Sequence, residues 1–161
     1  MRTQTKHRIL AIAIVASALA GCKPLVPSGF WKGYRSDAIV KQFSDQGPWG
    51  GERWILWESR SGEGLSETDA KRFAERHGWK FLSRVDASSQ SIHATSLFRN
   101  GNDRARDRFP KFIAGDSVVL KFDSGWMRED PGTNEMSTAY GYVQVSKDGC
   151  RMIVYHLWGN S

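Results

Sequence analysis

The sequence predicts an α+β fold: a single domain with a largely antiparallel sheet of about five to six strands and two helices packed on one face. Three observations lead to this expectation. The chain has 161 residues, of which 40% are hydrophobic and 25% charged, the size and composition of one globular domain. β-Branched and aromatic runs recur between turns rich in glycine, proline and aspartate. Most of these runs follow one another without a helical segment between them, as antiparallel strands do.

The first residues of the chain predict a secretion signal and not an element of the folded domain. Arg2, Lys6 and Arg8 form a basic flank without an acidic residue, and Ile9 to Ala20 is an uninterrupted apolar run that ends in small residues. This order is typical of a secretory signal peptide. The run is too short to span a bilayer core of about 30 Å as a helix that rises about 1.5 Å per residue.

The end of this segment, Leu19-Ala20-Gly21-Cys22, resembles the lipobox of bacterial lipoproteins. The resemblance implies cleavage between Gly21 and Cys22 and acylation of Cys22, with palmitate among the acyl chains that anchor the protein in the membrane. It further implies the envelope of a Gram-negative bacterium. Lys23 stands where inner-membrane lipoproteins often have aspartate, which favours the periplasmic face of the outer membrane and leaves the inner membrane possible.

The resemblance also divides the chain. Residues 1–21 are the removed signal peptide, 22–29 the lipidated cysteine with a short linker, and 30–161 the globular domain. Loss of the three basic residues lowers the net charge from +6 to +3, which argues against a nucleic-acid partner. Cys150 remains as the single other cysteine, so no intramolecular disulfide forms. We expect it to be buried in a strand, with an intermolecular bridge or a reactive thiol as alternatives.

The first element of the domain is expected over Ser36–Ser44. Ser36 is a suitable N-cap, Asp37 and Lys41 are spaced as a helical pair, and Gly47-Pro48 ends the segment, all of which favour a helix. The β-branched pair Ile39-Val40 favours a strand instead. After a glycine-rich loop, Glu52–Ser59 is predicted to be a strand that is apolar on both faces.

The second helix is the clearest element. Ser66 is the expected N-cap, and Ala70, Phe73, Ala74 and His77 recur at helical spacing. Gly78 supplies the left-handed residue that ends a helix. The segment Trp79–Val85 is expected to follow as a strand.

The next region is predicted to hold a strand over Ser91–Phe98 and an exposed loop over Arg99–Arg108. Ser117–Phe122 has the composition of a strand, and 123–133, with two glycines and a proline, that of a long turn.

The C-terminal residues predict a hairpin. The runs Thr138–Ser146 and Cys150–Trp158 are joined at Lys147-Asp148-Gly149. A two-residue type I′ turn would place Tyr142 opposite Tyr155, whereas a type I turn with a glycine bulge would place it opposite Val154. Large apolar groups on both faces predict that this hairpin is central in the sheet.

Catalytic motifs are absent from the sequence. It contains no GxSxG, HExxH, P-loop, EF-hand or paired-cysteine pattern. His77, His93 and His156 are too scattered to imply a metal site. An acid–base pair of Asp123 or Glu129 with His156 is compatible with the sequence but has no supporting pattern. We therefore assign no catalytic residue, no metal and no cofactor.

Two groups of residues are candidates for binding. Trp49 and Trp126, like Trp31, lie beside glycines in expected loops, and tryptophan is enriched at the centres of protein interfaces. The other group is the arginine cluster Arg99, Arg104, Arg106 and Arg108, whose charge is halved by Asp103 and Asp107. The resulting hypothesis is a lipid-anchored module that binds an envelope protein, as an accessory subunit or an immunity-type inhibitor. A small cell-wall or lipid hydrolase and a glycan- or lipopolysaccharide-binding module remain as alternatives.

Overall fold

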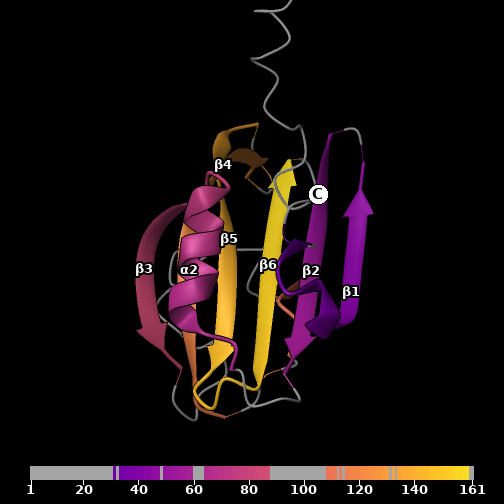
Figure 1. Ribbon diagram of the computed structural model, residues 1–161. Helices are drawn as coiled ribbons and strands as arrows, with labels where there is room; N and C mark the ends of the chain where they lie inside the picture. Colours follow the sequence, from indigo (N-terminus) through magenta and orange to yellow (C-terminus); the bar gives the residue numbers. More distant parts are fainter. Residues whose placement is uncertain are drawn as a thin grey trace, which may run out of the picture.

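The fold is a six-stranded sheet with strand order β1-β2-β6-β5-β4-β3, in which all neighbouring strands are antiparallel (Figure 1). A computed structural model describes residues 31, 33–47, 49–59, 64–87, 108–111, 113, 115–130, 132 and 134–159. The strands are β1 (Ile39–Gln46), β2 (Gly50–Glu58), β3 (Lys80–Asp86), β4 (Ser117–Glu129), β5 (Met136–Ser146) and β6 (Arg151–Gly159). Helix α2 (Glu67–Arg76) and the 3-10 turn η2 (Ser36–Ala38) complete the described elements.

The prediction of an antiparallel sheet with a helix on one face is confirmed, but the prediction of two helices is wrong for the part of the chain that the structure describes. The segment Ser36–Ser44 makes only the turn η2 and then becomes β1. A helical ion pair contributes only about 0.2–0.5 kcal/mol, whereas β1 pairs with β2 along nearly its whole length. The β-branched residues Ile39 and Val40 also favour the strand. The domain is therefore closer to a β-rich fold.

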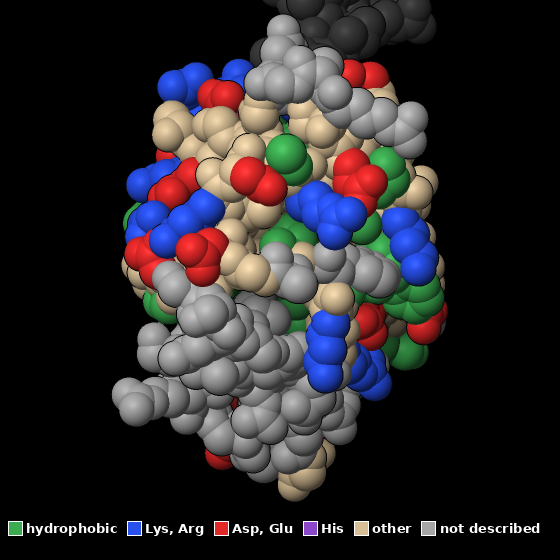
Figure 2. Space-filling model, turned by 90° about the horizontal axis from the view of Figure 1, so that it is seen from below, with side chains coloured by type: hydrophobic (Ala, Val, Ile, Leu, Met, Phe, Trp, Pro, Cys, Tyr) green, Lys and Arg blue, Asp and Glu red, His purple; other side chains and the backbone are tan. Residues whose placement is uncertain are grey.

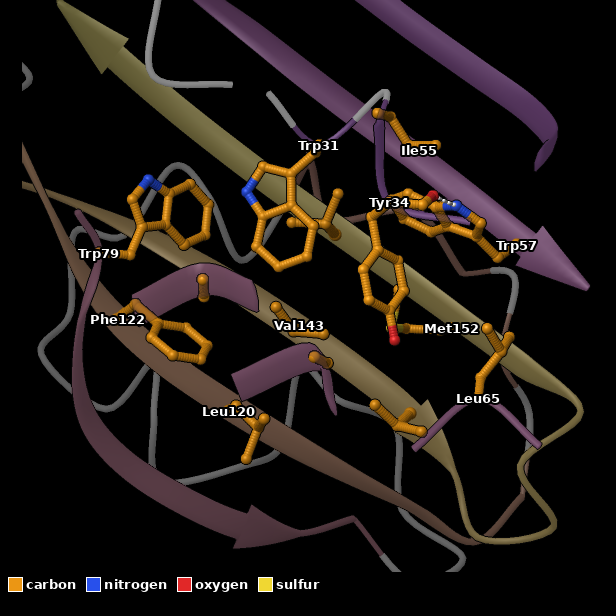
Figure 3. Packing of buried hydrophobic residues seen from close by; sticks show 14 of the residues in the cluster. Trp31, Tyr34, Ile55, Trp57, Leu65, Trp79, Leu120, Phe122, Val143 and Met152 are labelled. Atoms are coloured by element: carbon orange, nitrogen blue, oxygen red, sulfur yellow. Dashed lines mark hydrogen bonds between the residues drawn. The ribbon is translucent and has the colours of Figure 1, made fainter. Parts of the chain in front are cut away.

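Aromatic residues fill the face of the sheet that carries α2. Trp31 lies between the sheet and the helix, with its ring 5.2 Å from those of Phe73 and Trp79 (Figure 3). The Trp57 indole nitrogen donates a 2.6 Å hydrogen bond to the Tyr34 carbonyl. Trp31, which stands in an expected loop and is not among the predicted binding residues, is buried in this core. We call the face of the sheet that carries α2 the helix-bearing face.

The opposite face has a second core. Tyr142, Ile153 and Tyr155 of the central strands pack there with Phe109 and Ile113. Both faces of the β5–β6 hairpin are therefore covered, which confirms its central position. The predicted strand Ser91–Phe98 lies outside the described residues.

The β5–β6 hairpin adopts the register in which Tyr142 is opposite Tyr155. The turn itself is not type I′, because Gly149 has a positive φ (69°) and Asp148 does not. The Gly149 amide instead donates to the Ser146 carbonyl at 2.9 Å. Cys150 belongs to this turn, where its amide donates to the Asp148 carboxylate. The expectation of a buried Cys150 is wrong: it is exposed.

Helix α2 follows the predicted rules closely. The Ser66 hydroxyl accepts a 3.1 Å hydrogen bond from the Asp69 amide, as an N-cap should. Ala70 and Ala74 are fully buried against the sheet, and Gly78 has a φ of 90°. The His77 ring lies at the C-terminus of the helix, 2.8 Å from the Phe73 carbonyl.

Candidate functional site

An open groove of about 630 Å³ lies at one end of the sheet, where β1, β4 and β6 end. The β1–β2 turn provides Trp49, β4 provides Trp126 and Met127, and β5 provides Met136. Trp158 of β6 also lines it and is itself nearly buried. Trp49 has 79% of its surface exposed, and the two methionines about half. The groove is thus a concave apolar surface that water reaches.

A bulge in β4 places Trp126 on the groove. The predicted long turn over 123–133 is wrong, because β4 continues to Glu129. The pairing of β4 with β5 shifts between Asp123 and Trp126, and Gly125 there has a φ of 73°. The Asp123 carboxylate accepts a 2.8 Å hydrogen bond from the Gly125 amide and stabilises the bulge. Bulges of this kind redirect a side chain without ending the strand.

Glycines bring the walls of the groove together. At Gly159, φ is 67° and a side-chain carbon would overlap the backbone of Trp49 and Gly50. At Gly51, it would come within 2.7 Å of the Trp158 ring. Any larger residue at either position would push the β1–β2 turn away from β6.

Below the groove lies a buried hydrogen-bonded pair, His156 and Ser124. The His156 ring stacks on Trp158 with 5.0 Å between ring centroids, and its Nε2 lies 2.8 Å from the Ser124 hydroxyl oxygen. Ser124 must donate its proton to the Ala139 carbonyl, 2.7 Å away, because a carbonyl can only accept. His156 Nε2–H is therefore the donor to Ser124, and Nδ1 carries the lone pair. Burial lowers the pKa of His156 to about 3.

This pair is not arranged as a nucleophile and its base. A catalytic serine gives its proton to histidine, and here the proton points to a carbonyl instead. The acid–base pairs that the sequence allowed are not formed either. Asp123 is held by the bulge, and Glu129 lies opposite Met136 at the outer end of β4.

Arg53 lies directly across from His156 in the β2–β6 pairing. Its side chain is 4% exposed, and burial lowers its pKa. Among the described residues, Arg53 Nε and Nη2 and His156 Nδ1 have no hydrogen-bond partner. Arg53 and His156 are thus neighbouring buried polar residues on one face of the sheet.

No charged residue is among the described residues that line the groove. The acidic residues Glu129, Asp130 and Glu135 lie where β4 ends and β5 begins, next in the chain to the groove residues Met127 and Met136. Arg128 is paired with Asp130 at 3.5 Å. The other end of the molecule differs, since basic and acidic side chains are interspersed there (Figure 2), with pairs such as Arg151–Glu58 and Lys147–Asp86.

The two groups of predicted binding residues have different outcomes. The structure brings Trp49 and Trp126 to one groove although 77 positions separate them in the chain. Of the arginine cluster, only Arg108 lies within the described residues, where it is exposed and forms a 3.2 Å ion pair with Glu52. Arg99, Arg104 and Arg106 lie outside them.

Sequence analysis missed three groove residues, Met127, Met136 and Trp158. The two methionines carry no local signal beyond their hydrophobicity. Trp158 does end an apolar strand next to Gly159, and a large residue beside a glycine at a strand end is compatible with such a close approach.

In the described ranges, no group of histidine, cysteine, aspartate and glutamate side chains is placed to hold a metal ion. No helix in that part of the chain is long and apolar enough to cross a membrane. Comparison of the chain with protein-family models, curated proteins and solved structures found no match.

Proposed function

We propose that this protein is a lipid-anchored module of the bacterial envelope that binds a partner protein in the groove between Trp49 and Trp126. The occupant is an apolar or aromatic segment of the partner flanked by lysine or arginine. The observation that carries the proposal is the groove itself, to which three exposed apolar side chains contribute: Trp49, Met127 and Met136.

The composition of the groove favours a protein ligand. Tryptophan and methionine are enriched in protein interfaces, and methionine adapts its shape to different partners. Glu129, at the end of β4 and two residues after the groove residue Met127, supplies charge complementarity to a basic segment and would repel the phosphates of lipopolysaccharide. The glycan- and lipopolysaccharide-binding alternative is therefore less well supported.

The hydrolase alternative has less support still. Ser124 and His156 are buried beneath Trp158, and the direction of their hydrogen bond leaves the serine unactivated. None of the described residues that line the apolar groove has a side chain that acts as a general acid or base.

The anchor keeps the domain close to the membrane. The lipobox assigns acyl chains to Cys22, and each buried methylene contributes about 0.8 kcal/mol to membrane binding. The nine residues from Cys22 to Phe30 span at most about 30 Å. A partner embedded in or attached to the same membrane is thus within reach.

Photo-crosslinking in the native envelope tests the proposal. A photoreactive phenylalanine analogue replaces Met127 or Met136 in the full-length chain, and adducts are identified by mass spectrometry. We expect one partner protein, with an adduct yield that falls at least about fivefold in the Trp49→Ala/Trp126→Ala double variant. The Glu129→Gln variant should lower the yield at low salt more than at high salt.

The control places the same analogue at Leu82, an exposed apolar residue of β3 that does not line the groove. The same adducts from Leu82, or adducts from the groove to peptidoglycan or lipopolysaccharide alone, would contradict the proposal. Folding of each variant is checked by circular dichroism.

A further inference from the structure

The two edges of the sheet differ in how well they are protected. On the β3 edge, Arg84 makes ion pairs with Glu67 of the helix and with Asp86. On the β1 edge, residues 40–47 are all exposed, and Val40 and Phe43 expose 45% and 42% of their surfaces. A long exposed edge strand with apolar side chains is a template for pairing with another strand.

Beyond the bulge near Val40, successive residues of β1 lie on alternate faces of the strand. Lys41, Phe43 and Asp45 share one face of the strand, as their partners Leu56, Trp54 and Glu52 on β2 do. The Phe43 ring stacks on Trp54 at 6.0 Å between centroids. This face thus carries the order basic, aromatic, acidic.

A second copy of the strand that runs in the opposite direction presents the order acidic, aromatic, basic, which is complementary to the first. Two identical strands can pair antiparallel about a two-fold axis that is normal to the sheet. Residues opposite each other then lie on the same face of the sheet, so the axis must pass midway between one residue and the same residue of the second copy. An axis at Lys41 would place two lysines together, and an axis at Gln42 would place Lys41 opposite Phe43. An axis at Ser44 would place Phe43 opposite Asp45.

Only the axis at Phe43 pairs every residue of this face favourably. It places Phe43 opposite its copy, and Lys41 opposite Asp45 of the second copy on both sides of the axis. Aromatic and opposite-charge pairs are favourable cross-strand neighbours, whereas like charges directly opposite are unfavourable.

We propose that β1 is a homodimer interface, in which two copies of this chain pair their β1 strands antiparallel about Phe43 and form one continuous twelve-stranded sheet. The occupant of the exposed edge is thus a second copy of the chain.

This symmetry is compatible with two anchored copies. An axis normal to the sheet leaves the helix-bearing faces of both copies on the same side. Trp31, the first described residue, packs on that face, so the described part of both copies begins on the same side. Two chains acylated at Cys22 can therefore reach one bilayer through linkers of at most about 30 Å.

Cysteine crosslinking of the full-length chain tests the register. In a Cys150→Ser background, Phe43→Cys should form a disulfide dimer under mild oxidation, because opposite Cβ atoms lie about 4.5–5.5 Å apart. The single variants with Lys41→Cys or Asp45→Cys should each form no disulfide dimer. The double variant Lys41→Cys/Asp45→Cys should form one. Leu82→Cys on the β3 edge is the control for random collision.

Charge reversal tests the same pairing without removing Phe43. Lys41→Asp should raise the dimer dissociation constant about tenfold or more in sedimentation of the detergent-solubilised protein, and Lys41→Asp/Asp45→Lys should restore it. A chain that stays monomeric at all concentrations, equal crosslinking through Leu82→Cys, or a dissociation constant that charge reversal does not change would overturn the proposal.

Discussion

At the scale of single residues, His156 is the most informative group. It is neutral because burial lowers its pKa to about 3, and its ring is held between Trp79 and Trp158. An unfolded histidine has a pKa near 6.5. The unfolded chain therefore takes up a proton first as the pH falls, and the folded state loses stability through the window from about 6.5 to 3.

This predicts a specific pH dependence. His156→Phe should reduce the slope of the unfolding free energy by up to about 1.4 kcal/mol per pH unit between pH 6 and 4. Urea unfolding at several pH values measures it. Ile153→Val on the opposite core is the matched control, which should lower the free energy of unfolding by about 0.5–1.5 kcal/mol at every pH and keep the slope. An unchanged slope in His156→Phe would show that other groups carry the acid sensitivity.

Some tryptophans are buried in the core and others are exposed at the surface, although their local sequences are similar. Trp31 is 1% exposed, whereas Trp49 is 79% exposed. Both lie within two positions of a glycine, so this feature of the sequence does not distinguish them. The difference arises because Trp31 meets Phe73 and Trp79, which come from distant segments.

We expect this division to appear in stability. Trp31→Ala should lower the free energy of unfolding by about 3–5 kcal/mol, because a large buried ring is lost from the helix-bearing face. Trp49→Ala should change it by less than about 0.5 kcal/mol. Thermal and urea unfolding of both variants measure this. A large loss in Trp49→Ala would mean that the groove wall is part of the core, and would weaken its assignment as a binding surface.

At the scale of elements, α2 shows how far local rules reach. Its cap, its apolar stripe and its terminal glycine were all predictable, because each depends on residues within four positions of one another. The segment Ser36–Ser44 has similar helical signals but becomes a strand. Pairing with β2 overrides them, and within this segment that pairing involves residues nine to eighteen positions away.

The cap of α2 gives a direct test. Ser66→Ala removes the hydroxyl that accepts from the Asp69 amide, and should lower the free energy of unfolding by about 1 kcal/mol. Thr68→Ala in the same first turn is exposed and should have little effect. Chemical denaturation compares the two, and equal effects would mean that the hydroxyl does not stabilise the helix.

At the scale of the whole molecule, the described part of the sheet has two covered faces, an edge strand β1 that is exposed from Val40 onward, and one apolar end. The helix-bearing core and the opposite core bury β5 and β6 between them. The exposed large hydrophobic side chains among the described residues gather mainly at the groove and on β1, with Leu82 apart from both. The two proposals share only Gln46, which ends β1 and lines the groove, so the Trp49→Ala/Trp126→Ala variant should leave the dimer intact.

The sequence by itself determined the apolar central hairpin, helix α2 and the antiparallel character of the sheet, because these follow from alternation, periodicity and turn residues over short ranges. It also indicated the lipobox, whose lipidation stays a prediction. Only the tertiary structure decided that Trp49 and Trp126 share a groove, that Trp31 is buried and that β1 is an exposed edge. These outcomes depend on strand order and register, and hydrogen-bonded pairing between distant segments has no local signature in the chain.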